Sequence, residues 1–153
     1  MIIAIGSDHG GFLLKENIKK HLISNEIKFL DFGTHTDKNV DYPRYAYEVA
    51  CCVSEKKCNL GILCCGTGIG ISIAANKVKN IRAALCYDET CVKLAREHND
   101  ANILCLGGKI TDPKKAISLT KIFLETSFEK GRHQNRLNQI SEIENRTFKL
   151  TKF

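Results

Sequence analysis

The stretch LGILCCGTGIGIS, residues 60–72, decides the fold class of this chain. Residues 60–64 form a continuous apolar run without polar alternation, which predicts a strand covered on both of its faces. The glycines that follow predict a tight loop, and residues 69–77 then show the pattern of a helix. A buried strand that passes through a glycine-rich loop into a helix is typical of a parallel α/β sheet.

The same alternation of a short apolar run and a longer amphipathic segment continues in both directions along the chain. Pro43 and Pro113 fall in first helical turns, where proline is tolerated. A last, polar helix over residues 133–145 carries too few apolar residues for a core element, so we expect it to contact a partner chain or to frame a site. The remaining predicted elements are strands over residues 2–5, 28–32, 81–86 and 102–106, and helices over 12–23, 42–55, 89–98 and 113–128.

This pattern predicts a doubly wound, Rossmann-like α/β fold, a three-layer sandwich with a five-stranded parallel sheet and an extra C-terminal helix. Residues 1–153 are expected to form a single domain. No apolar run approaches the length of a membrane span, and the N-terminal run is too short for a signal peptide, so we expect a cytoplasmic protein without membrane contact. The net charge of +6 comes from basic residues spread over several helices, which favours a small anionic ligand over nucleic acid.

The chain has eight cysteines, which we expect to be reduced in the absence of a secretory signal. Cys65 differs from the others because it stands where the predicted strand gives way to the glycine loop. Backbone N–H groups in such a loop converge at the positive end of the following helix and would favour a thiolate. The remaining seven are interpreted as small, buried and inert side chains: Cys51, Cys52, Cys58, Cys64, Cys86, Cys91 and Cys105.

Polar residues follow the predicted strands, at the edge where parallel sheets bind ligands. After the first strand, Asp8 and His9 lie on a turn; a helix cap accounts for Asp8 but gives His9 no role. At the end of the helix over 89–98, His98 either complements the negative helix end or takes part in chemistry, and the residues alone leave both interpretations open. Asn99 follows it directly.

Two further features suit an anion. Arg132 and Arg136 are four residues apart, hence on one face of a helix, a spacing that suits a phosphate dianion, although single surface arginines are more often solvated. The glycine loop fits neither the dinucleotide fingerprint nor the phosphate-loop pattern, so its own specificity is limited.

Together these residues resemble the ribose-5-phosphate isomerase type B family, which is similar to the galactose-6-phosphate isomerase subunits. The matching stretches run in order along nearly the whole chain: GSDHGGF at 6–12, DYP at 41–43, CGTGIGISIAANK at 65–77, HNDAN at 98–102 and GRHQ at 131–134.

The resemblance implies an aldose–ketose isomerisation of ribose 5-phosphate through a cis-enediolate, with no metal or coenzyme. Cys65 would be the base, assisted by Thr67, and His98 would open the furanose ring. Asp8 would handle hydroxyl protons and Asn99 would fix a hydroxyl. The N–H groups of Gly66, Gly68 and Gly70 would stabilise the enediolate, and the phosphate would bind His9, Tyr42, Arg132 and Arg136, with His133 nearby.

The chain departs from the family pattern at two positions. Lys109 stands where many members have an arginine, which keeps the charge but loses the bidentate fork. Ile69 stands where one branch has a glutamate base, which favours the cysteine branch. The resemblance also implies a homodimer or dimer of dimers with shared sites, to which His98 and Lys109 would come from the partner.

Three alternatives stay open from the sequence. A hexose-6-phosphate isomerase, acting on allose or galactose phosphates, would differ only in pocket depth. A non-catalytic phosphate- or nucleic-acid-binding module would leave Cys65 and His98 without roles. A thiol redox protein using Cys64 and Cys65 is disfavoured because adjacent residues of a strand point to opposite faces.

Overall fold

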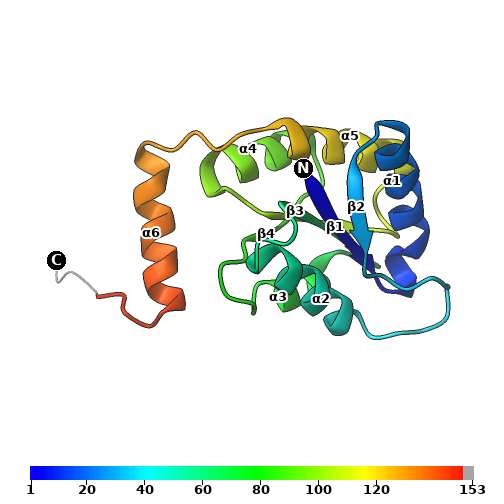
Figure 1. The fold of residues 1–153 in the computed structure, drawn as a ribbon, viewed down its shortest axis with the longest axis horizontal. Coiled ribbons are helices and arrows are strands. Elements are labelled where there is room, and N and C mark those ends of the chain that lie inside the picture. The colour runs from blue at the N-terminus through cyan, green and yellow to red at the C-terminus, as the bar shows by residue number, and fades with distance from the viewer. Residues whose placement is uncertain (150–153) are drawn as a thin grey trace.

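The computed structural model describes residues 1–149 of the chain. Five strands form one parallel sheet, as the apolar runs predict, in the order β2-β1-β3-β5-β4 (Figure 1). The strands are β1 (Ile2–Ser7), β2 (Lys28–Asp31), β3 (Leu60–Cys65), β4 (Ala83–Leu85) and β5 (Ile103–Gly107). The predicted α/β class and all-parallel sheet are confirmed.

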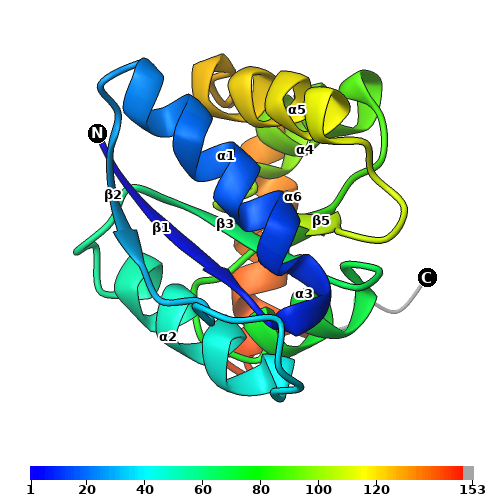
Figure 2. The same cartoon turned by 90° about the vertical axis from the view of Figure 1, so that its right-hand side faces the viewer.

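Helices cover the sheet on both faces, which gives the predicted three layers. Figure 2 shows α1, α4 and α5 on one side of the strands and α2 and α3 on the other. The helices are α1 (Phe12–Ser24), α2 (Tyr42–Ser54), α3 (Ile69–Ala75), α4 (Glu89–Asn99), α5 (Pro113–Glu125) and α6 (Arg132–Glu144), with a short 3-10 turn η1 (His9–Gly11) after β1.

Two apolar cores lie on the two faces of the sheet, and the strands contribute to them alternately. Ile62 and Cys64 belong to the core beneath α1, α4 and α5, whereas Leu63 and Cys65 belong to the core beneath α2 and α3. The alternation follows from the two-residue period of a strand. Cys64 and Cys65 therefore face opposite layers, which makes a Cys64–Cys65 redox pair sterically unsuitable.

Element ends differ from the prediction where side chains compete for backbone groups. The strand predicted over 81–86 is limited to Ala83–Leu85, because the Asn76 side chain pairs with the N–H and carbonyl of Ala83 at 2.8 and 2.9 Å on the outer edge of the sheet. The helix predicted over 113–128 ends at Glu125, where Thr126 turns extended and its carbonyl accepts a hydrogen bond from Arg96 at 3.2 Å.

The expectation that seven cysteines are buried is wrong for Cys91, which is exposed in the first turn of α4, and Cys51 is only partly buried. Helix periodicity places Cys91 on the solvent face of α4, opposite the buried Val92 and Ala95. The other five are buried, and all eight are free thiols.

A lysine is buried completely beside the end of β2. Lys15 of α1 has no exposed side-chain surface, and its ammonium group lies 2.7 Å from carboxylate oxygens of both Asp31 and Glu16. Lys19 also reaches Asp31 at 2.7 Å. Ion pairs of this kind offset the free-energy cost of removing an ammonium group from water.

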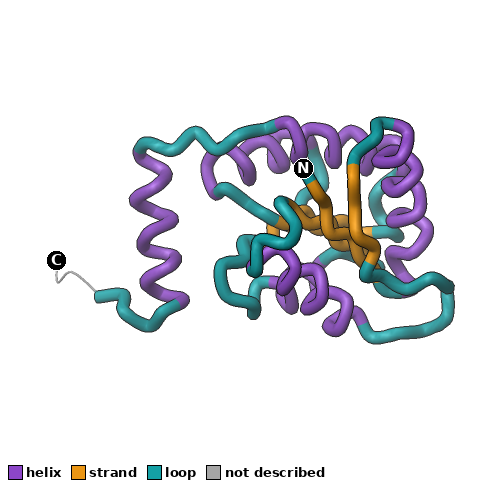
Figure 3. The backbone as a smooth tube through the Cα atoms, viewed as in Figure 1, coloured by secondary structure: helices purple, strands orange, loops and turns teal. Residues whose placement is uncertain are grey.

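Helix α6 lies outside the three layers, beside the β4 edge of the sheet (Figures 1 and 3). It buries His133 and Leu137, and Glu144 near its end accepts a hydrogen bond from the N–H of Asn80 at 2.9 Å. Between α6, α4 and β4 lies a groove of about 470 Å³ that is lined mainly by apolar side chains, among them Ile140 and Ile143. The predicted extra C-terminal helix is present, and it is not part of either core cluster.

Candidate functional site

The loops that follow β1, β3 and β5 meet at the carboxyl ends of the strands. Strand β1 pairs with β2 on one side and with β3 on the other. The chain therefore builds the sheet in one direction from β1 to β2 and in the opposite direction from β1 to β3. Doubly wound sheets bind ligands at such a switch point. The backbone N–H of Gly108 donates to the carbonyl of Cys65 at 2.7 Å, and that of Lys109 donates to the carbonyl of Gly66 at 3.0 Å, so the loop after β5 supports the glycine loop directly.

Cys65 ends β3 and begins the glycine loop. Its side chain is 5% exposed, and its sulfur accepts a hydrogen bond from the backbone N–H of Gly68 at 3.1 Å. Gly68 has a φ of +79°, a left-handed conformation that turns its N–H back toward the sulfur. The position and conformation of Gly68 thus give the Cys65 sulfur a backbone donor.

Tyr42 lies against the same loop. It is the first residue of α2, and a Cβ atom at Gly70 would lie 2.9 Å from its hydroxyl oxygen, so only glycine allows this approach. Thr67 extends the loop, and its hydroxyl accepts a hydrogen bond from the N–H of Ile69 at 3.3 Å. The sequence prediction did not include Tyr87, whose hydroxyl donates to the carbonyl of Thr67 at 3.1 Å. Its position directly after the strand predicted over 81–86 was the available signal.

Asp8 and His9 occupy the turn after β1. Asp8 is 6% exposed, and its Oδ1 accepts a hydrogen bond from the N–H of Gly11 at 3.0 Å, which is the capping role that the sequence offered. His9 has a role that capping does not explain: its Nδ1 lies 3.2 Å from the N–H nitrogen and from the carbonyl oxygen of Val40. This contact fixes the ring and leaves Nε2 for a ligand.

Lys109 lies beside the glycine loop of its own chain. A Cβ atom at Gly66 would lie 3.6 Å from the Cδ and Cε atoms of Lys109. The expectation that Lys109 would come to the site from a partner therefore differs from the structure, in which the loop after β5 follows the strand directly adjacent to β3. The pairing of neighbouring parallel strands brings their carboxyl ends together.

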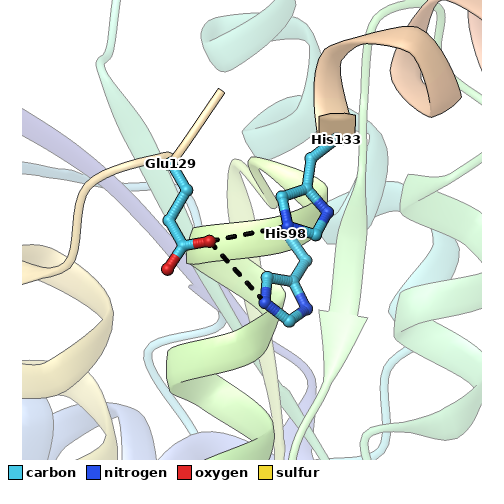
Figure 4. Close-up of side chains that lie close together, drawn as sticks. All are labelled: His98, Glu129 and His133. Carbon is cyan, nitrogen blue, oxygen red and sulfur yellow. Dashed lines mark ion pairs between the residues drawn. The ribbon is translucent and has the colours of Figure 1, made fainter. Parts of the chain in front are cut away.

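A second group of predicted residues lies at the amino ends of the strands, and Figure 4 shows part of it. His98 stands in the last turn of α4, and His133 stands in the first turn of α6. Their imidazole rings stack with centroids 4.1 Å apart and planes 10° apart. Glu129, which the sequence prediction missed, lies 3.9 Å from Nε2 of His98 and 3.5 Å from Nε2 of His133.

Two arginines complete this second group. The Nε atom of Arg132 lies 3.4 Å from Nε2 of His133, and Nη1 of Arg136 lies 3.5 Å from Nδ1 of the same ring. Burial lowers the pKa of His133, and the neighbouring His98 and both arginines lower it further, whereas Glu129 acts in the opposite direction. His133 is therefore a neutral ring at neutral pH. Asn99 is exposed and lines the groove beside α6.

The two groups are separated within one chain by the length of a strand. Strand β5 has five residues, a span of about 16 Å at about 3.3 Å per residue. Cys65 lies at the carboxyl end of the sheet, whereas α4 returns antiparallel to the strands and delivers His98 to the amino end. One small ligand cannot contact both groups of a single chain.

Comparison with known proteins gives the family. The sequence profile of the family described as Ribose/Galactose Isomerase matches residues 3–140. The chain belongs to this family. Ribose-5-phosphate isomerase B of Escherichia coli is 43% identical over 144 residues, which cover 94% of this chain and 97% of that protein.

Solved structures agree with the assignment to the ribose/galactose isomerase family. The ribose-5-phosphate isomerase B of Clostridium thermocellum superposes with a TM-score of 0.94 at 46% identity, covering 95% of this chain and 99% of that one. The enzyme of Mycoplasma genitalium, solved with bound ribulose 5-phosphate, gives a TM-score of 0.90 at 42% identity, with 94% and 96% covered. In residues 1–149, no helix combines the length and the apolar character needed to cross a bilayer.

For this member of the isomerase family, the structure divides the predicted site residues between the two ends of the strands. Those at the carboxyl end are Asp8, His9, Tyr42, Cys65, Gly66, Thr67, Gly68, Gly70 and Lys109, and those at the amino end are His98, Asn99, Arg132, His133 and Arg136. The N–H of Gly68 is already directed at the Cys65 sulfur, so of the three predicted loop donors only Gly66 and Gly70 stay candidates for binding a substrate oxygen.

His98, Glu129 and His133 are also residue types that bind divalent metal ions, and their ligand atoms lie within 4.8 Å of one another. A metal ion lies in the plane of each imidazole that binds it. Two stacked rings whose planes differ by 10° do not direct their nitrogens to a common point. The observed arrangement therefore suits proton exchange and ion pairing better than metal binding.

Proposed function

We propose that this chain interconverts D-ribose 5-phosphate and D-ribulose 5-phosphate through a cis-enediolate, with Cys65 as the base. The observation that carries the proposal is the hydrogen bond from the N–H of Gly68 to the Cys65 sulfur, at the switch point of the sheet. The E. coli and C. thermocellum relatives, both called ribose-5-phosphate isomerase B, support the choice of substrate.

The reaction starts with the open-chain aldehyde. The Cys65 thiolate takes the proton from C2, the C2–H electrons form the C1=C2 bond, and the carbonyl oxygen O1 accepts negative charge and then a proton. Loss of the O2 proton forms the C2 carbonyl, and Cys65 returns its proton to C1. The N–H groups of Gly66 and Gly70 stabilise the charged oxygens, and Asp8 exchanges the hydroxyl protons, with Thr67 beside the sulfur.

His98 opens the furanose ring by passing a proton to the ring oxygen, and Asn99 holds a sugar hydroxyl. The phosphate dianion is held by His9, Tyr42 and Lys109 at the carboxyl ends of the strands. Arg132 and Arg136, next to His133, complete the phosphate site. The proposed chemistry requires no metal or coenzyme.

The separation of the two groups supports a site shared between two copies of the chain. A second copy would place its His98, Asn99, Arg132 and Arg136 against the glycine loop of the first, in a homodimer or a dimer of dimers. Exposed apolar side chains support such contact: Ile69 and Ile73 on α3 are 50% and 56% exposed, and Ile140 and Ile143 on α6 are 45% and 59% exposed. Surfaces of this kind are typical of subunit interfaces.

The test is isomerisation of ribose 5-phosphate by the purified protein, with and without a metal chelator. Cys65→Ala should lower kcat by about a hundred- to ten-thousandfold, the contribution of a general base. Cys91→Ser, at an exposed cysteine, is the matched control and should keep full activity. Activity that survives Cys65→Ala would assign the base to another residue, and a wild type that prefers allose or galactose 6-phosphate would replace the pentose substrate.

A further inference from the structure

Glu129 lies between two histidines in the segment that joins α5 to α6, and Figure 4 shows its carboxylate directed at both rings. Its Oε2 atom lies 3.5 Å from Nε2 of His133 and 3.9 Å from Nε2 of His98. The three side chains come from three different segments of the chain. Neither the sequence pattern nor the proposed mechanism gives Glu129 a role.

The backbone around Glu129 is tied to α4, so the carboxylate is placed rather than free. The N–H of Glu129 donates to the carbonyl of Glu97 at 3.0 Å, and Arg96 binds the carbonyl of Thr126 at 3.2 Å. On the other side, the N–H of His133 donates to the carbonyl of Lys130 at 3.1 Å. The first two contacts fix the linker against the helix that carries His98, and the third fixes its other end to the start of α6.

The charges around the two rings leave Glu129 as the acid that faces them in the described structure. On α4, Glu97 is paired with Lys93 at 3.6 Å, and Arg96 with Asp100 at 2.9 Å. On α6, the cations Arg132 and Arg136 both face His133. Both arginines contact the nitrogens of His133, which leaves His98 as the ring of the stacked pair that can face a substrate.

We propose that Glu129 is a positioning residue that holds the His98 imidazole, stacked on His133, in the orientation that opens the furanose ring. The carboxylate faces Nε2 of His98 and so leaves Nδ1 for a substrate oxygen. In ring opening, the bond between C1 and the ring oxygen breaks, the ring oxygen gains a proton, and the C1 hydroxyl loses one to become the aldehyde. A carboxylate on the far nitrogen keeps a proton on Nε2, so Nδ1 can take the proton of the C1 hydroxyl and then pass it to the ring oxygen. The inference rests on the proposed function.

The experiment separates ring opening from proton transfer at carbon. Ribulose 5-phosphate has no free C5 hydroxyl to close a furanose, so deuterium exchange at its C1 in D₂O reports the Cys65 step alone. Glu129→Gln should lower kcat/KM for ribose 5-phosphate by about ten- to a hundredfold, because a catalytic group has lost its orientation. Its C1 exchange rate should stay within about twofold of the wild type, since this step does not use His98.

Glu125→Gln is the matched control, because Glu125 is an exposed glutamate at the end of α5, directly before the linker, with no ion pair in residues 1–149. It should leave both rates unchanged. Added to His98→Asn, Glu129→Gln should cause no further loss, because a positioning residue has nothing left to position. An equal fall in both rates, or full additivity with His98→Asn, would overturn the inference.

A readout that does not depend on turnover completes the test. Glu129 is the one neighbour that raises the pKa of His133, so an NMR titration of Glu129→Gln should show a lower pKa for that ring. An unchanged titration of His133 would overturn the placement of the carboxylate. A wild type that neither isomerises ribose 5-phosphate nor exchanges C1 would instead contradict the proposed function itself.

Discussion

The backbone N–H of Gly68 points at the sulfur of Cys65 across 3.1 Å. The contact depends on the left-handed conformation of Gly68, at φ +79°, which reverses the chain between β3 and α3. Any side chain at this position would enter the layer below, since a Cβ atom would lie 2.5 Å from Cδ1 of Leu85 and 2.9 Å from the carbonyl carbon of Leu106. Conformation and space together therefore require glycine beside the thiol.

Gly68→Ala should destabilise the fold by about 1–3 kcal/mol, through the strained backbone and the clash with neighbouring atoms. It should also lower activity, because the N–H turns away from the sulfur. Urea unfolding and the isomerase assay measure the two effects. Gly66→Ala is the control for stability, since its Cβ would make only an ordinary contact of 3.6 Å with Lys109. A Gly68→Ala protein as stable as Gly66→Ala would contradict the role of this glycine.

Asp31→Asn should destabilise the protein by about 2–4 kcal/mol at neutral pH, because it removes a carboxylate from the fully buried Lys15. Lys15 keeps Glu16, so the loss should stay below that of an entirely unpaired charge. Chemical denaturation measures it. Asp37→Asn, in an exposed loop, should change stability by less than about 0.5 kcal/mol; equal effects of the two variants would contradict a structural role for the buried pair.

The same ion pairs predict how stability depends on pH. Burial by itself would raise the pKa of Asp31, but hydrogen bonds from Lys15, Lys19 and the N–H of Gly33 outweigh it and hold the pKa below its usual range. A carboxyl whose pKa is lower in the folded state contributes stability above its unfolded value of about 3.9, and that stability is lost as the pH falls through the folded value. Unfolding free energies measured from pH 7 down to pH 2 should fall more steeply below pH ~4 in the wild type than in Asp31→Asn. Parallel curves would contradict this assignment.

Lys109→Met should raise KM for the sugar phosphate by about tenfold and leave kcat within about twofold, because the proposed role of this side chain is to bind the phosphate and not to take part in the proton transfers. Lys109→Arg should bind at least as tightly as the wild type, since a guanidinium adds a bidentate contact. Steady-state kinetics separate the two constants. Lys114→Met, at the exposed start of α5, is the control. A fall in kcat with an unchanged KM would place Lys109 in the chemistry instead.

A shared site predicts complementation between two defective variants. Cys65→Ala and His98→Asn each damage every site of a homodimer, but a mixed dimer contains one site with both residues intact. Unfolding and refolding the two proteins together in equal amounts should restore about a quarter of wild-type activity, because half of the dimers are mixed and each has one intact site. Mixing without refolding is the control. No recovery after refolding would contradict a site built from two chains.

The sequence by itself determined most of the elements and the glycine loop that carries Cys65. The apolar runs and glycines at 60–72 predict β3, its turn and α3, because strand burial and positive φ are local properties of a few residues. The position of Cys65 at that boundary follows from the same stretch, as does the alternation that separates it from Cys64. The resemblance of five stretches pointed to the family that the comparisons then gave.

Only the tertiary structure decided which loops meet. The order β2-β1-β3-β5-β4 depends on pairing between strands distant in sequence. It brings Lys109 to the glycine loop of its own chain, whereas His98 lies at the amino ends of the strands. Glu129 and Tyr87 acquire their contacts in the same way, through segments that no local pattern connects. Local periodicity fixes how each segment folds, whereas non-local packing fixes which side chains face one another.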